Sequence, residues 1–179
     1  MSAMLSKKYR QDYQLEYERG PSGRLRETAS YVGGYFAFDR PLDALRRIWL
    51  PPAVAAMVFL LVQLWFTDLY GPELRTLSLP AALSAPAFFW AAMGVGRIAV
   101  MKENQMTRQA KDRICNRLPA GALVFLICSV LAFGAAVWGL AALGFSLARA
   151  LYALDAACQA ALALLLFLRR KTLAVHTLP

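Results

Sequence analysis

The chain has 179 residues, of which 59% are hydrophobic and only 17% are charged. Soluble domains usually carry about 25% charged residues, so this composition excludes an ordinary soluble domain. It also excludes a disordered chain, because such chains combine few apolar residues with many charges. The mean hydropathy of +0.44 and several long uncharged runs indicate a membrane protein that forms one fold unit.

A membrane location also explains the positive charge balance of the chain. Lys and Arg number 20 against 11 acidic residues, which gives a net charge of +9. In a soluble chain this excess would suggest nucleic-acid binding, but here the basic residues flank apolar runs, as they do where charge sets membrane topology. We therefore predict no nucleic-acid partner. Three cysteines and a single histidine without paired spacing predict no metal site, no disulfide framework and no cofactor.

Residues 1–40 form a separate N-terminal arm by composition. Tyr13, Leu15 and Tyr17 alternate with polar residues, as in a strand, although tyrosines spaced by four would also share a helix face. The Gly-Pro-Ser-Gly sequence at residues 20–23 is a dense turn signal. We predict a cytoplasmic β-hairpin, with a small three-stranded meander as the alternative.

A short helix is expected to lead from the arm into the membrane. Asp39 is a candidate N-cap and Pro41 falls in the first turn. Basic side chains beside such a lead-in meet anionic lipid at the membrane surface, and the other basic loops are expected to do the same. The predicted anionic-lipid contacts are Arg40, Arg46, Arg47, Arg97, Lys102, Arg169, Arg170 and Lys171.

Four membrane spans follow from run length. A bilayer core of about 30 Å needs about 20 helical residues, and the uncharged runs at residues 48–67 and 76–96 meet that length. The run at residues 118–148 is too long for one simple span and contains Gly144-Phe145-Ser146, a predicted tight turn. The predicted fold is an all-α four-transmembrane-helix bundle with the hairpin arm. Its membrane domain covers residues 41–171, with spans at 47–68, 77–101, 119–142 and 147–168, and residues 172–179 form a cytoplasmic tail.

Loop charge predicts the orientation of these spans. The regions before the first span, between the second and third, and after the fourth carry nine, six and three basic residues, which is 18 of the 20. Basic loops stay on the cytoplasmic side, so both termini are predicted to be cytoplasmic in a plasma membrane or a bacterial inner membrane. Pro51 and Pro52 are expected in the opening turns of the first span, where a missing amide costs little.

Asp155 is the most informative residue inside a predicted span. A charge in the bilayer core costs at least about 2.5 kcal/mol on insertion scales. Tyr152, Asp155 and Gln159 share one helix face, and Arg149 and Gln63 complete a candidate intramembrane polar site. In one interpretation Asp155 is neutral or hydrogen-bonded and holds helices together. In the other it binds and releases a proton or cation during transport.

Residues for catalysis are missing from the sequence. His176 is the only histidine and lies in the tail, and no phosphate-binding glycine loop or metalloprotease motif occurs. We therefore predict a non-enzymatic accessory or scaffold subunit of a membrane complex, with the lipid bilayer and a transmembrane or cytoplasmic protein, or a homo-oligomer, as partners. One alternative is a small oligomeric transporter or channel that uses Asp155. A second is a lipid-sensing membrane regulator.

Overall fold

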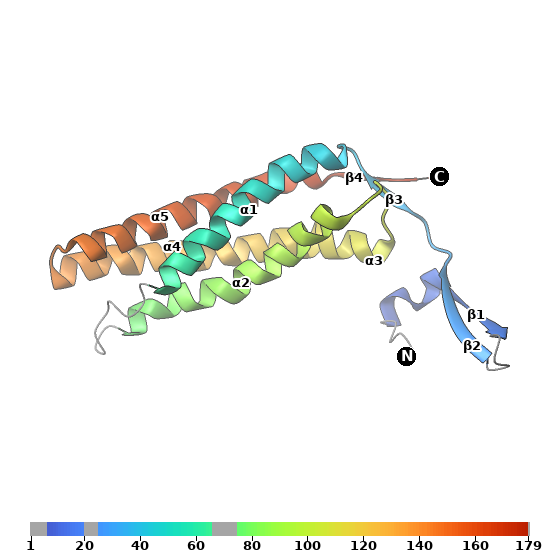
Figure 1. The fold of residues 1–179 in the computed structure, drawn as a ribbon, viewed down its shortest axis with the longest axis horizontal. Coiled ribbons are helices and arrows are strands. Elements are labelled where there is room, and N and C mark those ends of the chain that lie inside the picture. Colours follow the sequence, from blue (N-terminus) through green and yellow to red (C-terminus); the bar gives the residue numbers. More distant parts are fainter. Residues whose placement is uncertain (1–6, 20–24, 66–74, 179) are drawn as a thin grey trace.

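The computed structural model describes residues 7–19, 25–65 and 75–178. Four long helices pack side by side into an elongated bundle (Figure 1), which confirms the predicted fold class. Their bounds are α1 Leu42–Trp65, α2 Arg75–Val100, α4 Arg117–Leu143 and α5 Leu147–Leu168.

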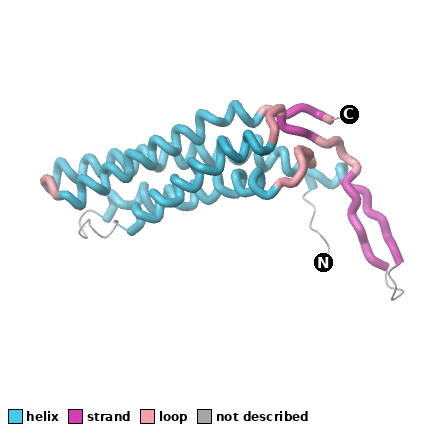
Figure 2. The backbone as a smooth tube through the Cα atoms, turned by 45° about the horizontal axis from the view of Figure 1, so that its top comes forward, coloured by secondary structure: helices cyan, strands magenta, loops and turns pink. Residues whose placement is uncertain are grey.

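The N-terminal arm is the predicted hairpin. Strands β1 (Tyr13–Arg19) and β2 (Leu25–Tyr31) pair in antiparallel register, with Tyr13 opposite Tyr31. A 3₁₀ segment, η1 (Lys7–Asp12), precedes them. The hairpin projects away from one end of the bundle (Figures 1 and 2). The predicted turn at residues 20–23 lies outside the described residues.

A third strand forms, but it does not extend the hairpin into a meander. Strand β3 (Phe36–Phe38) pairs instead with β4 (Val175–Thr177) from the C-terminal tail. The Phe36 backbone also exchanges hydrogen bonds with Met106 in the loop after α2. The arm, the central loop and the tail are therefore joined by backbone hydrogen bonds at the end of the bundle where most basic residues lie, which we call the basic end.

Short helical pieces connect the long helices at the basic end. Helix α3 (Arg108–Lys111) is capped by Thr107, whose hydroxyl accepts a hydrogen bond from the backbone N–H of Ala110. A π-helical turn, η4 (Asp112–Asn116), joins α3 to α4, and a 3₁₀ turn, η5 (Arg169–Leu173), follows α5. These pieces extend two of the long helices beyond their apolar spans.

Helix α1 begins earlier than the predicted first span. The lead-in and the span form one helix from Leu42, so Pro51 and Pro52 lie inside it and not in its opening turns. Proline has no N–H, so Pro52 leaves the carbonyl of Ile48 without its helical donor. The guanidinium of Arg169, from the end of α5, donates to that carbonyl. A distant side chain thus replaces the missing backbone bond, which is how prolines are tolerated in membrane helices.

The α4–α5 connection is the predicted tight turn. Helix α4 ends at Leu143, and Gly144 follows with φ of 78°, a left-handed conformation that glycine adopts without a steric penalty. The hydroxyl of Ser146 caps α5 by accepting from the backbone N–H of Arg149. Small buried residues, including Ala136, Ala153 and Ala156, let the two helices approach closely.

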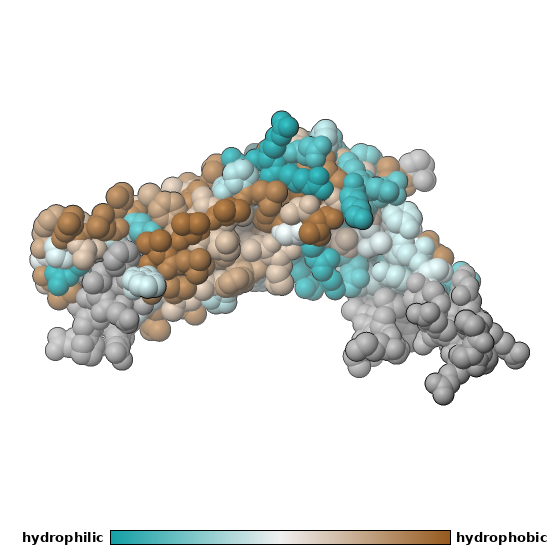
Figure 3. Space-filling view, in the orientation of Figure 1, coloured by the Kyte–Doolittle hydropathy of each residue, from teal (hydrophilic) through white to brown (hydrophobic). Residues whose placement is uncertain are grey.

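The surface of the bundle is strongly apolar, in keeping with a lipid environment. Brown apolar side chains cover much of the bundle in Figure 3, and hydrophilic side chains gather toward the basic end. Trp65, Met93, Leu131 and Trp138 are among many large apolar residues that are exposed. Four described helical segments are long and apolar enough to cross a membrane. The chain is a multi-pass membrane protein by helix length and hydropathy.

Candidate intramembrane polar site

Polar side chains are buried inside the bundle. Among the described residues, five polar or charged ones are buried, and each of the four long helices contributes at least one. We call this set the polar layer; it consists of Gln63 in α1, Ser84 in α2, Ser129 in α4, and Asp155 and Gln159 in α5.

Contacts between the helices place three of these residues at one level. The rings of Phe88 in α2 and Phe125 in α4 lie 5.3 Å apart between centroids. Because α2 and α4 run antiparallel, four residues back along α2 and four forward along α4 lead to Ser84 and Ser129, one turn away on both helices. Gln159 of α5 joins them, since its Nε2 donates to Ser84 Oγ at 3.4 Å.

Gln63 and Asp155 lie within about a turn of the same level. Arg169 reaches Ile48, and the indole N–H of Trp49 donates to Thr172 Oγ1 at 3.1 Å. Counting equal distances from these contacts along the antiparallel helices α1 and α5 places Gln63 opposite residues 154–158. Asp155 falls within that stretch, so the layer crosses the whole bundle.

Apolar packing encloses the polar layer on both sides. Toward the basic end, one core cluster includes Leu60, Phe88, Phe125 and Ala163. Toward the opposite end, a second, smaller cluster contains Tyr152 and three alanines. A polar layer between two apolar clusters sits in a low-dielectric environment, where each polar group has a large effect on packing or chemistry.

Hydrogen bonding within the layer is incomplete. Ser84 Oγ donates to the carbonyl of Ala81 at 2.6 Å. Among the described residues no partner is found for either polar atom of the Gln63 amide, or for Ser129 Oγ, Asp155 Oδ2 and Gln159 Oε1. Buried polar atoms without partners cost free energy. The layer therefore holds both donors and acceptors, together with one carboxyl group able to carry a proton.

Three of the five residues predicted for this site belong to the polar layer, and two do not. Gln63, Asp155 and Gln159 are members of it. Tyr152 is buried beside it, in the smaller apolar cluster. Arg149 lies elsewhere, because its Nη1 donates to the carbonyls of Leu143 and Gly144 at 2.7 and 2.9 Å. It caps the end of α4 and does not approach the carboxylate.

Ser84 was not among the predicted site residues. A lone serine in an apolar helix carries little sequence signal, since serine is common in membrane helices and bonds to its own backbone there. The signal that would identify Ser84 is its position relative to residues of the neighbouring helix. Ser84 and Ser129 are equally spaced from the Phe88–Phe125 pair, but that pairing becomes known only when the helices are docked.

The predicted lipid contacts divide into two groups. Arg46 and Arg169 hold backbone carbonyls: Arg46 Nε donates to Ile98 at 3.5 Å and its Nη2 to Met101, while Arg169 holds Ile48. The remaining predicted contacts lie at the basic end or near it. The exposed ones are Arg40, Arg47, Arg97, Lys102, Arg170 and Lys171.

No metal-binding arrangement accompanies the polar layer. Within residues 7–19, 25–65 and 75–178, no group of three or more His, Cys, Asp or Glu side chains is placed to hold an ion. Comparison with protein-family models, curated proteins and solved structures found no match.

Proposed function

We propose that the chain is a non-enzymatic accessory or scaffold subunit of a membrane complex, and that the β1–β2 hairpin docks a cytoplasmic protein. The observation that carries this proposal is the projecting hairpin (Figure 2). Its sheet has two strands, and neither outer edge pairs with another described strand. Open strand edges accept a further strand from a partner, and a lone two-stranded hairpin gains stability from such a cover.

The base of the arm is fixed to the bundle, so the hairpin is held in a defined position. The Tyr9 hydroxyl donates to Asp112 Oδ2 at 2.7 Å. The Tyr31 hydroxyl accepts from the backbone N–H of Arg108 at 3.0 Å, and Arg108 Nη1 lies 3.8 Å from Asp12 Oδ1. This anchoring presents the strand edges at low entropic cost to a partner.

The cytoplasmic orientation of the arm is part of the proposal. It is supported by the basic residues that flank this end in the sequence. A docking arm on this side would meet a soluble or membrane-associated protein, while the apolar helix surfaces remain available to lipid or to a transmembrane subunit.

Affinity purification from native membranes tests the docking arm. The tagged full chain is compared with Thr28→Pro, which removes a backbone donor in β2 and disrupts strand pairing, and with Thr28→Val, which keeps β propensity. We expect mass spectrometry to find a stoichiometric companion with the wild type and Thr28→Val, and at least a tenfold loss with Thr28→Pro. A homogeneous species that contains only this chain would refute the accessory role. A companion retained by all three would refute docking through the hairpin.

A small transporter or channel is the second candidate function, and the polar layer favours it. Buried carboxyl and amide groups from several helices are the usual elements of a transport site. Proton or cation flux into proteoliposomes is measured for Asp155→Asn and for the control Asp43→Asn, whose carboxylate is exposed and pairs with Arg46. Transport through the layer predicts flux lost only with Asp155→Asn, at normal expression. Equal flux in both variants assigns Asp155 to packing.

A further inference from the structure

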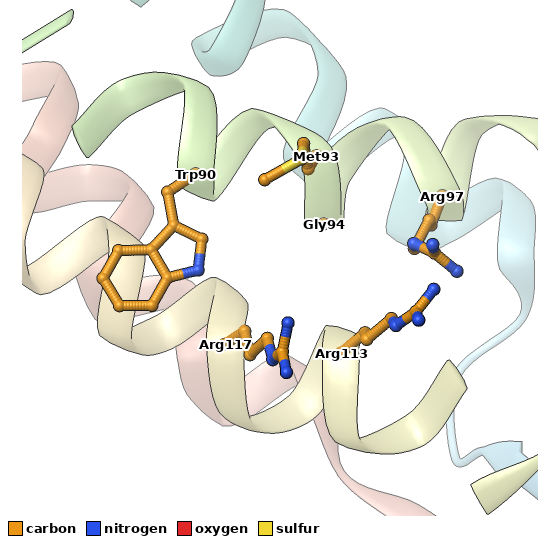
Figure 4. Close-up of a pocket in the computed structure, with 6 residues that line it drawn as sticks. All are labelled: Trp90, Met93, Gly94, Arg97, Arg113 and Arg117. Atoms are coloured by element: carbon orange, nitrogen blue, oxygen red, sulfur yellow. The ribbon is translucent and has the colours of Figure 1, made fainter. Parts of the chain in front are cut away.

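Three arginines converge on one pocket at the basic end, where α2 meets η4 and the start of α4. In Figure 4 the side chains of Arg97 and Arg113 point toward one another, Arg117 enters the same space, and Trp90 lies at the opposite end. We call these three arginines the arginine cluster. The pocket has a volume of about 160 Å³. Its lining residues are Trp90, Met93, Gly94, Arg97, Arg113 and Arg117.

Two glycines bring the helices close enough to form this cluster. A Cβ added to Gly94 of α2 would meet the Leu118 side chain at 2.7 Å, and one added to Gly121 of α4 would meet the backbone nitrogen of Ala91 at 2.8 Å. Such contacts require glycine at both positions. The close crossing places the last turn of α2, which carries Arg97, against η4 and the first turn of α4.

The cluster gathers positive charge without a counter-charge from the described chain. Ion pairs in the described part of the protein involve other cations, namely Arg46, Arg108 and His176. Like charges four residues apart on a helix repel one another, and Arg113 and Arg117 have that spacing in addition to facing Arg97. The arrangement favours a bound anion that shares several guanidinium donors.

The opposite end of the pocket is apolar and faces outward. Met93 is 65% exposed and Trp90 is 40% exposed, and both lie nearer the membrane interior than Arg97 along α2. A free anion would leave this apolar wall uncovered. A molecule with an anionic group and an attached hydrocarbon chain would contact both parts of the pocket.

We propose that this pocket binds the phosphate of an anionic phospholipid, with the phosphate among the arginine cluster and the adjoining lipid chain along Trp90 and Met93. Guanidinium groups match phosphate oxygens with paired hydrogen bonds, and three of them, from α2, η4 and α4, fix the headgroup in one position. Bound lipid would then bridge α2 and α4 at the basic end. The site is independent of the docking arm, so either can fail without the other.

Lipid titration of the purified full chain in detergent, followed by native mass spectrometry, tests this site. The probes are dioleoylphosphatidylglycerol, dioleoylphosphatidylcholine and inorganic phosphate. We expect phosphatidylglycerol to bind about tenfold or more tightly than phosphatidylcholine, because the quaternary ammonium of phosphatidylcholine brings a positive charge next to the arginine cluster and phosphatidylglycerol brings none. Equal binding of the two lipids would overturn the proposal.

Matched arginine variants separate a built site from general surface charge. Arg117→Gln removes one member of the cluster, and Arg47→Gln removes an exposed arginine at the same end of the bundle. We expect phosphatidylglycerol affinity to fall about tenfold or more with Arg117→Gln and at most about fivefold with Arg47→Gln. Equal losses would overturn the site. Should Arg117→Gln not fold, Arg97→Gln from the opposing helix makes the same test.

Inorganic phosphate distinguishes a lipid from a free anion. If the apolar wall contributes, millimolar phosphate displaces little phosphatidylglycerol, and Trp90→Ala weakens lipid binding. Full displacement by phosphate, with no effect of Trp90→Ala, would overturn the lipid assignment and leave an anion site.

Discussion

Two sets of arginines in this protein perform different tasks. Arg46, Arg149 and Arg169 each donate to backbone carbonyls: Arg46 and Arg149 at or near the ends of α2 and α4, and Arg169 inside α1. The arginine cluster instead faces a pocket and has no acidic partner in the described chain. The first set supplies hydrogen-bond donors to carbonyls that lack a helical partner. The second set concentrates positive charge at one pocket. Loop charge alone treats Arg46, Arg169 and the arginine cluster as the same topological signal.

The two sets differ in whether a backbone carbonyl without a helical donor lies within reach of the guanidinium. A carbonyl freed by a proline or exposed at a helix end needs a donor inside an apolar bundle, and an arginine from a neighbouring helix supplies it. Arginines with no such carbonyl to hold remain available for an external ligand. Removing an arginine that holds a carbonyl should therefore lower the free energy of unfolding, whereas removing one from the arginine cluster should raise it.

The largest effect is expected at Arg169. Replacing Arg169 with leucine leaves the Ile48 carbonyl without a donor, because Pro52 cannot supply one. The expected loss is about 1–3 kcal/mol of unfolding free energy, measured by denaturant unfolding in detergent micelles. In a Pro52→Ala background the helix regains its own N–H, so the same change should cost less than about half as much. An equal cost in both backgrounds would mean that Arg169 acts through another contact.

Most of the fold could be predicted from the sequence because it depends on run length and local signals. The four spans follow from uncharged stretches, the α4–α5 turn from Gly144, and the hairpin from residue alternation. The start of α1 could not, since Pro51 and Pro52 look like a helix beginning. Their tolerance inside the helix depends on Arg169, which is distant in sequence.

The candidate sites were harder to predict from the sequence, because they too depend on contacts between distant segments. Asp155 and Gln159 stand out as polar residues in an apolar helix, and the structure places them in the polar layer. Ser84, Arg113 and Arg117 do not stand out in the sequence, because their surroundings depend on the close crossing of α2 and α4. Spacing along one helix cannot show which side chains of another helix lie opposite.

A smaller loss is expected at Arg149. Arg149→Gln removes charged donors from the carbonyls at the end of α4, an interaction that is worth about 0.3–1 kcal/mol at a helix C-terminus. Denaturant unfolding measures the loss, and the flux assay supplies the control. Loss of flux at unchanged stability would instead group Arg149 with Asp155 and contradict its role as a cap.

The smallest effect, and the one of opposite sign, is expected at Arg117. Without anionic lipid and at low salt, Arg117→Gln relieves repulsion with Arg97 and Arg113, so unfolding free energy should rise by about 0.2–0.5 kcal/mol. At 1 M salt, where screening acts within about 3 Å, this gain should vanish. Arg47→Gln should show no comparable gain at either salt concentration. A loss of stability with Arg117→Gln would place Arg117 with the carbonyl-holding arginines and remove the basis for a charged pocket awaiting an anion.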